Sequence, residues 1–165
     1  FMFFYSLASA MSIRVATFQG MKDWIQLKRS ARAGRDILLA VAVVASFVFY
    51  FFGPSLIGFF TKDAAVIQMA VMLIPGLIFY QYADAMQICY ANALRGTAFV
   101  KPMAPIALVS YLCIGIPVGY LLGFVFDWKL NGLFLGLPAG LFTAAGLFFY
   151  YFRRAMKRNL QASLS

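Results

Sequence analysis

The sequence contains no histidine and no glutamate, and only 12% of its 165 residues are charged. Lack of histidine removes the usual zinc and haem ligand and the usual base of a Ser-His-Asp triad. Its two cysteines, Cys89 and Cys113, lie in apolar runs without CxxC spacing, and we interpret them as small buried apolar residues. Because no nucleophile–base or metal-ligand constellation appears, we expect neither an enzyme nor a bound cofactor.

Apolar residues dominate what remains. They make up 64% of the chain, and the mean hydropathy is +0.85, whereas soluble domains contain about 45–50% apolar residues. A soluble fold of this length could not bury so much apolar surface. The composition therefore excludes an ordinary globular domain and a disordered tail, and it predicts an integral membrane protein.

Four uncharged runs are long enough to cross a membrane as helices, which takes about 20 residues. They are residues 37–61, 64–83, 102–126 and 130–152. A fifth apolar run, residues 1–13, is too short to cross unaided, and we interpret it as part of a span that begins upstream. A secretory signal is the alternative, but no basic region precedes the run. The predicted fold class is an all-α polytopic membrane protein with five helices, at residues 1–19, 37–61, 64–94, 102–126 and 130–152.

The basic residues alternate between connections. Twelve of the 14 lysines and arginines are Arg14 or lie in segments 20–36, 95–101 and 153–165. The other two connections carry one each, Lys62 and Lys129. Because cytoplasmic loops are enriched in Lys and Arg, this pattern predicts that the three basic segments, including the C-terminal tail 153–165, are cytoplasmic. Orientation of the chain in the membrane and contact with anionic lipids are sufficient to explain these basic segments. No nucleic-acid partner is therefore expected.

The connection 20–36 mixes apolar and basic residues. Trp24, Ile25 and Leu27 recur at helical spacing among the cations. We expect a short amphipathic helix in the inner membrane interface, and the alternative is a solvated loop.

Glycines recur every four residues in the last two spans. Helices in lipid associate largely through close backbone approach, which small residues permit. We therefore predict that these two spans pack through two glycine ridges, Gly115, Gly119 and Gly123 on one and Gly132, Gly136 and Gly140 on the other.

Asp84 is the one acidic residue well inside an apolar span, and other polar residues share its helix face. Tyr80, Gln81, Gln87 and Asn92 lie within about 80° of it on a helical wheel. An ionised carboxylate at this depth is costly unless it is paired, coordinated or protonated. We interpret Asp84 as a proton-exchanging or sodium-binding group assisted by the Tyr80 hydroxyl, with the two glutamines and Asn92 as candidates to line a cavity. The alternative is a permanently protonated Asp84 hydrogen-bonded to a neighbouring helix.

Several short segments occur along the chain in a characteristic order and spacing. Besides the helix from Gln81 through Asp84 to Gln87, they are Arg14 with Gly20 and Asp23, Phe60-Thr61-Lys62-Asp63, Leu94-Arg95-Gly96, Gly115-Ile116-Pro117 with Tyr120, and Asn131-Gly132-Leu133 with Gly136. In this order they resemble the C-terminal lobe of the MATE (multidrug and toxic compound extrusion) family of cation-coupled antiporters. The resemblance covers essentially all 165 residues.

The resemblance implies that the five helices are spans 8–12 of a twelve-helix, two-lobe transporter. It also implies export of cationic amphipathic drugs or toxins in exchange for sodium ions or protons. Asp84 and Tyr80 match the cation-binding acid and tyrosine of the tenth span. An acid on the seventh span and the N-terminal lobe of the same polypeptide would then lie upstream of residue 1.

Other functions remain open from the residues alone. One is a lipid-linked oligosaccharide flippase of the same superfamily, and another is a non-transporting membrane scaffold subunit. We expect a multi-pass protein of the bacterial inner membrane with a cytoplasmic C-terminus.

Overall fold

The computed structural model describes residues 2–126 and 128–162, and within these ranges the chain is helical with short connections and no strand. Four stretches are long and apolar enough to cross a membrane, namely Trp24–Phe60, Ala64–Gly96, Met103–Val125 and Gly132–Leu160. This confirms the predicted all-α polytopic class. In chain order the elements are α1 (Met2–Gly20), α2 (Trp24–Phe60), α3 (Ala64–Gly96), α4 (Met103–Leu108), η1 (Val109–Gly115), α5 (Ile116–Tyr120), η2 (Leu121–Val125) and α6 (Lys129–Ala162).

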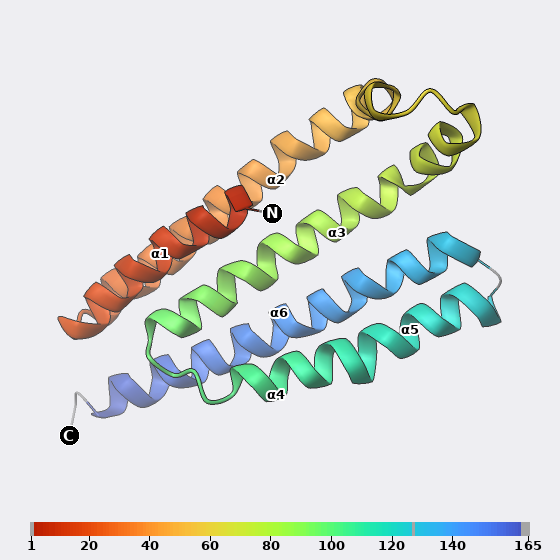
Figure 1. Ribbon diagram of the computed structural model, residues 1–165. Coiled ribbons are helices and arrows are strands. Elements are labelled where there is room, and N and C mark those ends of the chain that lie inside the picture. Colours follow the sequence, from red (N-terminus) through yellow and green to blue (C-terminus); the bar gives the residue numbers. More distant parts are fainter. Residues whose placement is uncertain (1, 127, 163–165) are drawn as a thin grey trace.

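The long helices lie side by side with α3 in the middle (Figure 1). Helix α3 contacts α1 and α2 on one side and α6 on the other, and the segment from α4 to η2 packs along α6. The α1–α2 turn, the α3–α4 connection and the C-terminal end of α6 all lie at one end of the bundle (Figure 1). The three basic segments therefore lie at the same end, as alternation along the chain predicts.

Residues 24–36 form the first turns of α2, which continues to Phe60. Segment 20–36 is thus helical from Trp24, as expected, rather than a loop, but it is the start of a long helix and not a short helix by itself. Asp23 marks the start, because its Oδ1 accepts a hydrogen bond from the Gln26 N–H at 3.0 Å. No proline interrupts the helix before Pro54, and the interior Gly34 lies against the Met11 side chain of α1. One continuous helix is the consequence.

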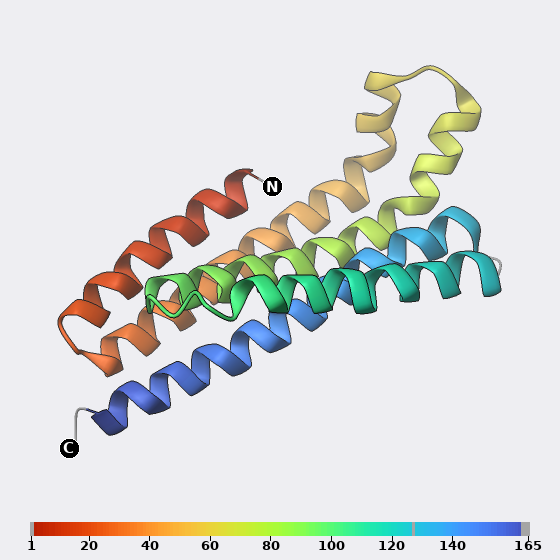
Figure 2. The same cartoon turned by 60° about the horizontal axis from the view of Figure 1, so that its bottom comes forward.

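The buried core lies between α1, α2, α3 and α6. The Sγ of Cys89, which is fully buried on α3, is 3.9 Å from the Sδ of Met11. The second half of α2, which contains Pro54, contributes little to this core, and its end turns away from the other helices (Figure 2). Six of its seven aromatic side chains are exposed, namely Phe47, Tyr50, Phe51, Phe52, Phe59 and Phe60, and Phe49 is half-buried. Outward-facing apolar side chains of this kind are typical of helices solvated by lipid.

The third of these stretches, Met103–Val125, contains two π-helical segments, η1 and η2. At the end of η1, the Ile116 N–H donates to the carbonyl oxygen of Tyr111, five residues earlier. Pro117 follows directly and has no N–H to donate. The π-type hydrogen bonds, which span five residues instead of four, thus occur directly before the position where proline cannot donate. Short π-helical segments of this kind occur within α-helices.

The two glycine ridges meet where the segment from η1 to η2 packs against α6. A Cβ placed on Gly136 would lie 2.6 Å from the Gly119 nitrogen and 2.8 Å from the Gly115 carbonyl oxygen. One placed on Gly140 would lie 3.2 Å from the Gly115 Cα. The predicted packing of the last two spans through their glycines is confirmed, and it leaves no room for side chains at the centre of the contact.

Candidate functional site

Four aspartates lie in the described part of the chain, and three of them have evident structural roles. Asp23 and Asp63 cap the first turns of α2 and α3. Asp36 pairs with Arg35, whose Nη2 is 2.7 Å from its Oδ1. Asp84 differs, because no hydrogen bond or ion pair joins its carboxyl group to another described residue. It is therefore the carboxylate left available for a ligand.

Asp84 lies deep in the bundle, with only 7% of its surface exposed. Tyr80 precedes it by one helical turn on α3, and the two side chains lie within electrostatic range of each other. Tyr111, on η1, lies within electrostatic range of both. The predicted pair of Asp84 and Tyr80 is thus joined by a second tyrosine from a different span.

Helix α6 packs against both tyrosines. The rings of Tyr80 and Phe134 have centroids 6.2 Å apart and are tilted against each other. The Tyr111 ring lies over Gly140, where its Cδ1 would be 3.4 Å from an added Cβ. The absence of a side chain at Gly140 lets this ring approach α6 closely. The glycine ridge that packs the last two spans therefore also positions Tyr111.

The other three polar residues on the Asp84 face of α3 are Gln81, Gln87 and Asn92, and they differ in whether their side-chain hydrogen-bonding groups have partners. Gln81 is buried, and its Nε2 has no hydrogen-bond partner among the described residues. Gln87 is half-buried. Asn92 is buried too, but its Nδ2 already donates to the Ile88 carbonyl oxygen at 3.0 Å. Of the three residues, Gln81 thus offers a free buried donor near Asp84, whereas the Asn92 donor is engaged within its own helix.

Tyr111 is the residue that sequence reasoning missed. It precedes Gly115 by four residues and so continues the glycine ridge by one turn. This spacing places it on the face turned to α6, but spacing alone does not show that it comes within electrostatic range of Asp84 on α3. That relation depends on how far the stretch Met103–Val125 is shifted along its neighbours.

The donor set is a single carboxylate with two phenol oxygens and an amide side chain nearby. Among residues 2–126 and 128–162, no group of three or more Asp, Glu, Cys or His residues could hold a metal ion. A polydentate transition-metal centre does not match this arrangement, whereas oxygen donors suit a hard cation. Such a set of oxygen donors is chemically suited to a proton or a small hard cation.

A bundle of apolar spans is the architecture of a polytopic membrane protein, and a buried carboxyl group within such a bundle is typical of a functional site. Comparison with known proteins agrees with that class. The chain belongs to the MATE family, since the MatE family profile matches residues 1–121. Members of this family are transporters rather than enzymes, as expected from the lack of a catalytic constellation.

Curated relatives are similar over nearly the whole chain. A protein of Bacillus cereus named "Probable multidrug resistance protein NorM" is 34% identical over 159 residues, which is 96% of this chain and 35% of that protein. A Xanthomonas campestris protein of the same name is 32% identical over 158 residues, 96% of this chain and 34% of its own length. The chain thus spans only 34–35% of the length of these relatives.

Two solved structures share the fold. The crystal structure of the eukaryotic MATE transporter AtDTX14 superposes with a TM-score of 0.79 at 23% identity, over 94% of this chain and 37% of that one. The inward-facing structure of a multidrug resistance MATE family transporter of the MOP superfamily superposes with a TM-score of 0.84 at 14% identity. The match covers 94% of this chain and 36% of that one. At these identities the likeness shows the fold.

Proposed function

We propose that this chain forms the second half of a two-lobe exporter that expels cationic amphipathic compounds in exchange for sodium ions or protons. The observation that carries the proposal is the buried Asp84 carboxyl group, which has no partner among the described residues and lies near Tyr80 and Tyr111. Membership of the MATE family and the names of the bacterial relatives support it.

The mechanism proposed for the site is neutralisation of one buried charge. With Asp84 ionised, its helix face requires contact with water or an organic cation; with a proton or sodium ion bound, the same face tolerates an apolar environment. Pro75 interrupts the backbone hydrogen bonds of α3 nine residues before Asp84, so α3 has a point at which it can bend. Ion binding shifts the balance between inward- and outward-open states by its difference in affinity for the two.

The placement of cations favours export of a cation over the flipping of a lipid-linked oligosaccharide. A flippase must hold a pyrophosphate, which calls for Lys and Arg beside the transport cavity. On α3 the residues that share the Asp84 face near it are acidic or neutral. The three basic segments lie instead at one end of the bundle (Figure 1).

For the orientation, we propose a bacterial inner-membrane protein with a cytoplasmic C-terminus. The positive-inside rule supports this, because the α1–α2 turn, the α3–α4 connection and the C-terminal end of α6 share one end of the bundle (Figure 1). The bacterial source of the relatives supports the location.

The function is tested in proteoliposomes that contain the full-length transporter bearing this chain. A fluorescent organic cation is loaded on one side, and a sodium or a proton gradient is imposed separately across the membrane. We expect dye movement that follows one of the gradients and stops when that gradient is collapsed. Dye movement independent of both gradients, or translocation of a lipid-linked oligosaccharide in its place, would contradict the proposal.

The phenol groups near Asp84 yield a further prediction. Tyr80→Phe and Tyr111→Phe each remove one oxygen from the ion site while keeping the ring that packs against α6. We expect each variant to require a several-fold higher concentration of the coupling ion for half-maximal efflux, with efflux at saturating ion largely retained. Tyr82→Phe is the matched control, because Tyr82 lies on the other face of α3 and packs against the core. An equal effect of all three changes would argue against the assignment.

A further inference from the structure

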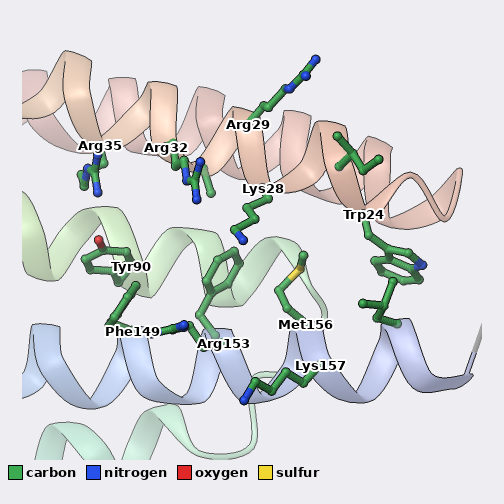
Figure 3. A pocket seen from close by; sticks show the side chains of 14 residues that line it. Trp24, Lys28, Arg29, Arg32, Arg35, Tyr90, Phe149, Arg153, Met156 and Lys157 are labelled. Atoms are coloured by element: carbon green, nitrogen blue, oxygen red, sulfur yellow. The ribbon is translucent and has the colours of Figure 1, made fainter.

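A pocket of about 690 Å³ opens between α2 and α6 at the basic end of the bundle, away from Asp84. Its walls are the first turns of α2 and the last turns of α6, and Tyr90 of α3 lies between them (Figure 3). Tyr90 follows Asp84 by six residues and points about 120° away around the helix. The pocket is therefore separate from the ion site.

Cations surround the pocket from both walls. Those in its lining are Lys28, Arg29, Arg32, Arg35, Arg153 and Lys157, and no acidic side chain lines it. Within residues 2–126 and 128–162, the one ion pair is that of Arg35 with Asp36. The side chains of Lys28 and Arg32 reach from α2 into the space above α6, whereas Arg29 points away (Figure 3). This much unneutralised positive charge requires an anionic partner or bulk counterions.

The remaining lining of the pocket is apolar. The rings of Tyr90 and Phe149 are 4.9 Å apart between centroids, and Phe152 is buried beside them. The Arg153 guanidinium lies over the Phe149 ring, 5.5 Å from its centroid. Trp24 closes the end of the pocket nearest the start of α2 (Figure 3). The pocket thus combines a cationic rim with an aromatic floor.

We propose that this pocket binds an anionic phospholipid of the cytoplasmic leaflet. The phosphate headgroup lies among Lys28, Arg32 and Arg153, and the first part of an acyl chain lies along the aromatic floor. Arg35 and Arg153 fall just outside the predicted limits of their spans, at residues 37 and 152. That level is where headgroups lie and where Lys and Arg attract anionic lipids. The proposal rests on the orientation given under Proposed function.

Amphipathic chemistry distinguishes this ligand from a soluble anion. Inorganic phosphate or a nucleic-acid backbone would use the cations but would leave the rings of Tyr90, Phe149 and Phe152 against water. A zwitterionic lipid would use the rings but would bring its own positive charge towards the cations. An anionic phospholipid satisfies both parts of the pocket.

The test measures lipid binding to the full-length transporter by native mass spectrometry in detergent. The probes are phosphatidylglycerol and phosphatidylcholine with identical acyl chains, and the soluble competitor is glycerol 3-phosphate. In the pocket variant Lys28→Gln, Arg32→Gln and Arg153→Gln are combined. The control variant combines Arg95→Gln, Lys101→Gln and Arg154→Gln. It removes three positive charges, as the pocket variant does, but from exposed positions outside the pocket. All six positions are exposed, so both variants are expected to fold.

We expect the pocket variant to lose about tenfold or more in phosphatidylglycerol affinity, while the control variant stays close to the unchanged protein. Equal losses in both variants, or no loss in either, would overturn the proposal. So would equal binding of phosphatidylcholine, or displacement of phosphatidylglycerol by glycerol 3-phosphate at matched concentration. Asp84→Asn is expected to leave lipid binding unchanged, so failure of the transport proposal and failure of this one are distinguishable.

Discussion

Replacement of Asp84 by Asn is expected to reduce gradient-driven efflux to the level of protein-free vesicles. The change keeps the size and shape of the side chain, but an amide neither takes up a proton near neutral pH nor offers a negative charge to a sodium ion. Because no hydrogen bond or ion pair holds the Asp84 carboxyl group among the described residues, its loss breaks no contact that supports the fold. The effect should therefore appear in transport and not in protein yield or thermal stability.

The matched control for this variant is Asp36→Asn. It makes the same chemical change at an exposed position, where it loses the pair with Arg35. Exposed ion pairs contribute about 0–1 kcal/mol, so efflux by this variant should stay close to the unchanged protein. Efflux that survives in Asp84→Asn at the level of the control would remove the ion-site assignment. A variant that folds poorly shows itself by size-exclusion profile and melting temperature before transport is measured.

The second large effect is expected at the centre of the glycine contact. Gly136→Ala places a Cβ 2.6 Å from the Gly119 nitrogen and 2.8 Å from the Gly115 carbonyl oxygen, both backbone atoms that no side-chain rotation can move. Helix α5 must therefore separate from α6. Overpacking of this kind costs about 1–3 kcal/mol, which opposes the gain of about 1 kcal/mol in helix propensity from Gly to Ala. We expect a clear fall in melting temperature in detergent.

Gly146→Ala supplies the comparison, since nothing lies within 4 Å of a Cβ added at Gly146 on the same helix. The gain in helix propensity is common to both substitutions, so the difference between the two melting temperatures isolates the backbone contact. We expect Gly146→Ala to be neutral or slightly stabilising. If Gly136→Ala behaves in the same way, the two ridges do not pack as described.

Local sequence features predicted the parts of the fold that depend on one helix at a time. Uncharged runs of sufficient length located the spans, because each helix in lipid must satisfy its own backbone hydrogen bonds. The four-residue spacing of glycines located the contact between the last two spans for a similar reason, since only small residues let helix backbones meet. The helix expected in segment 20–36 is present from Trp24, but it continues into the next span as one helix, because polarity marks where a helix leaves the hydrocarbon and not where the helix ends.

In the candidate site too, the residues on one helix were predicted and the residue from another span was not. A helical wheel placed Tyr80 and Gln81 beside Asp84, because these residues share one helix. Tyr111 was missed because it lies on η1, a different span from Asp84, and the relative shift of the two spans depends on side-chain packing along α6. The lipid pocket was missed for the same reason, since residues 28 and 153 share no local pattern.

By itself, then, the sequence predicted an all-α polytopic membrane protein, the apolar runs that form its spans, and one acidic group among them that needs a partner, an ion or a proton. Each of these follows from the cost of placing polar groups in lipid, which acts on every helix independently. Only the tertiary structure decided which spans bring a second tyrosine to Asp84 and which cations gather between α2 and α6. Those relations are set by the register of packed helices, which side-chain shape determines and no single segment encodes.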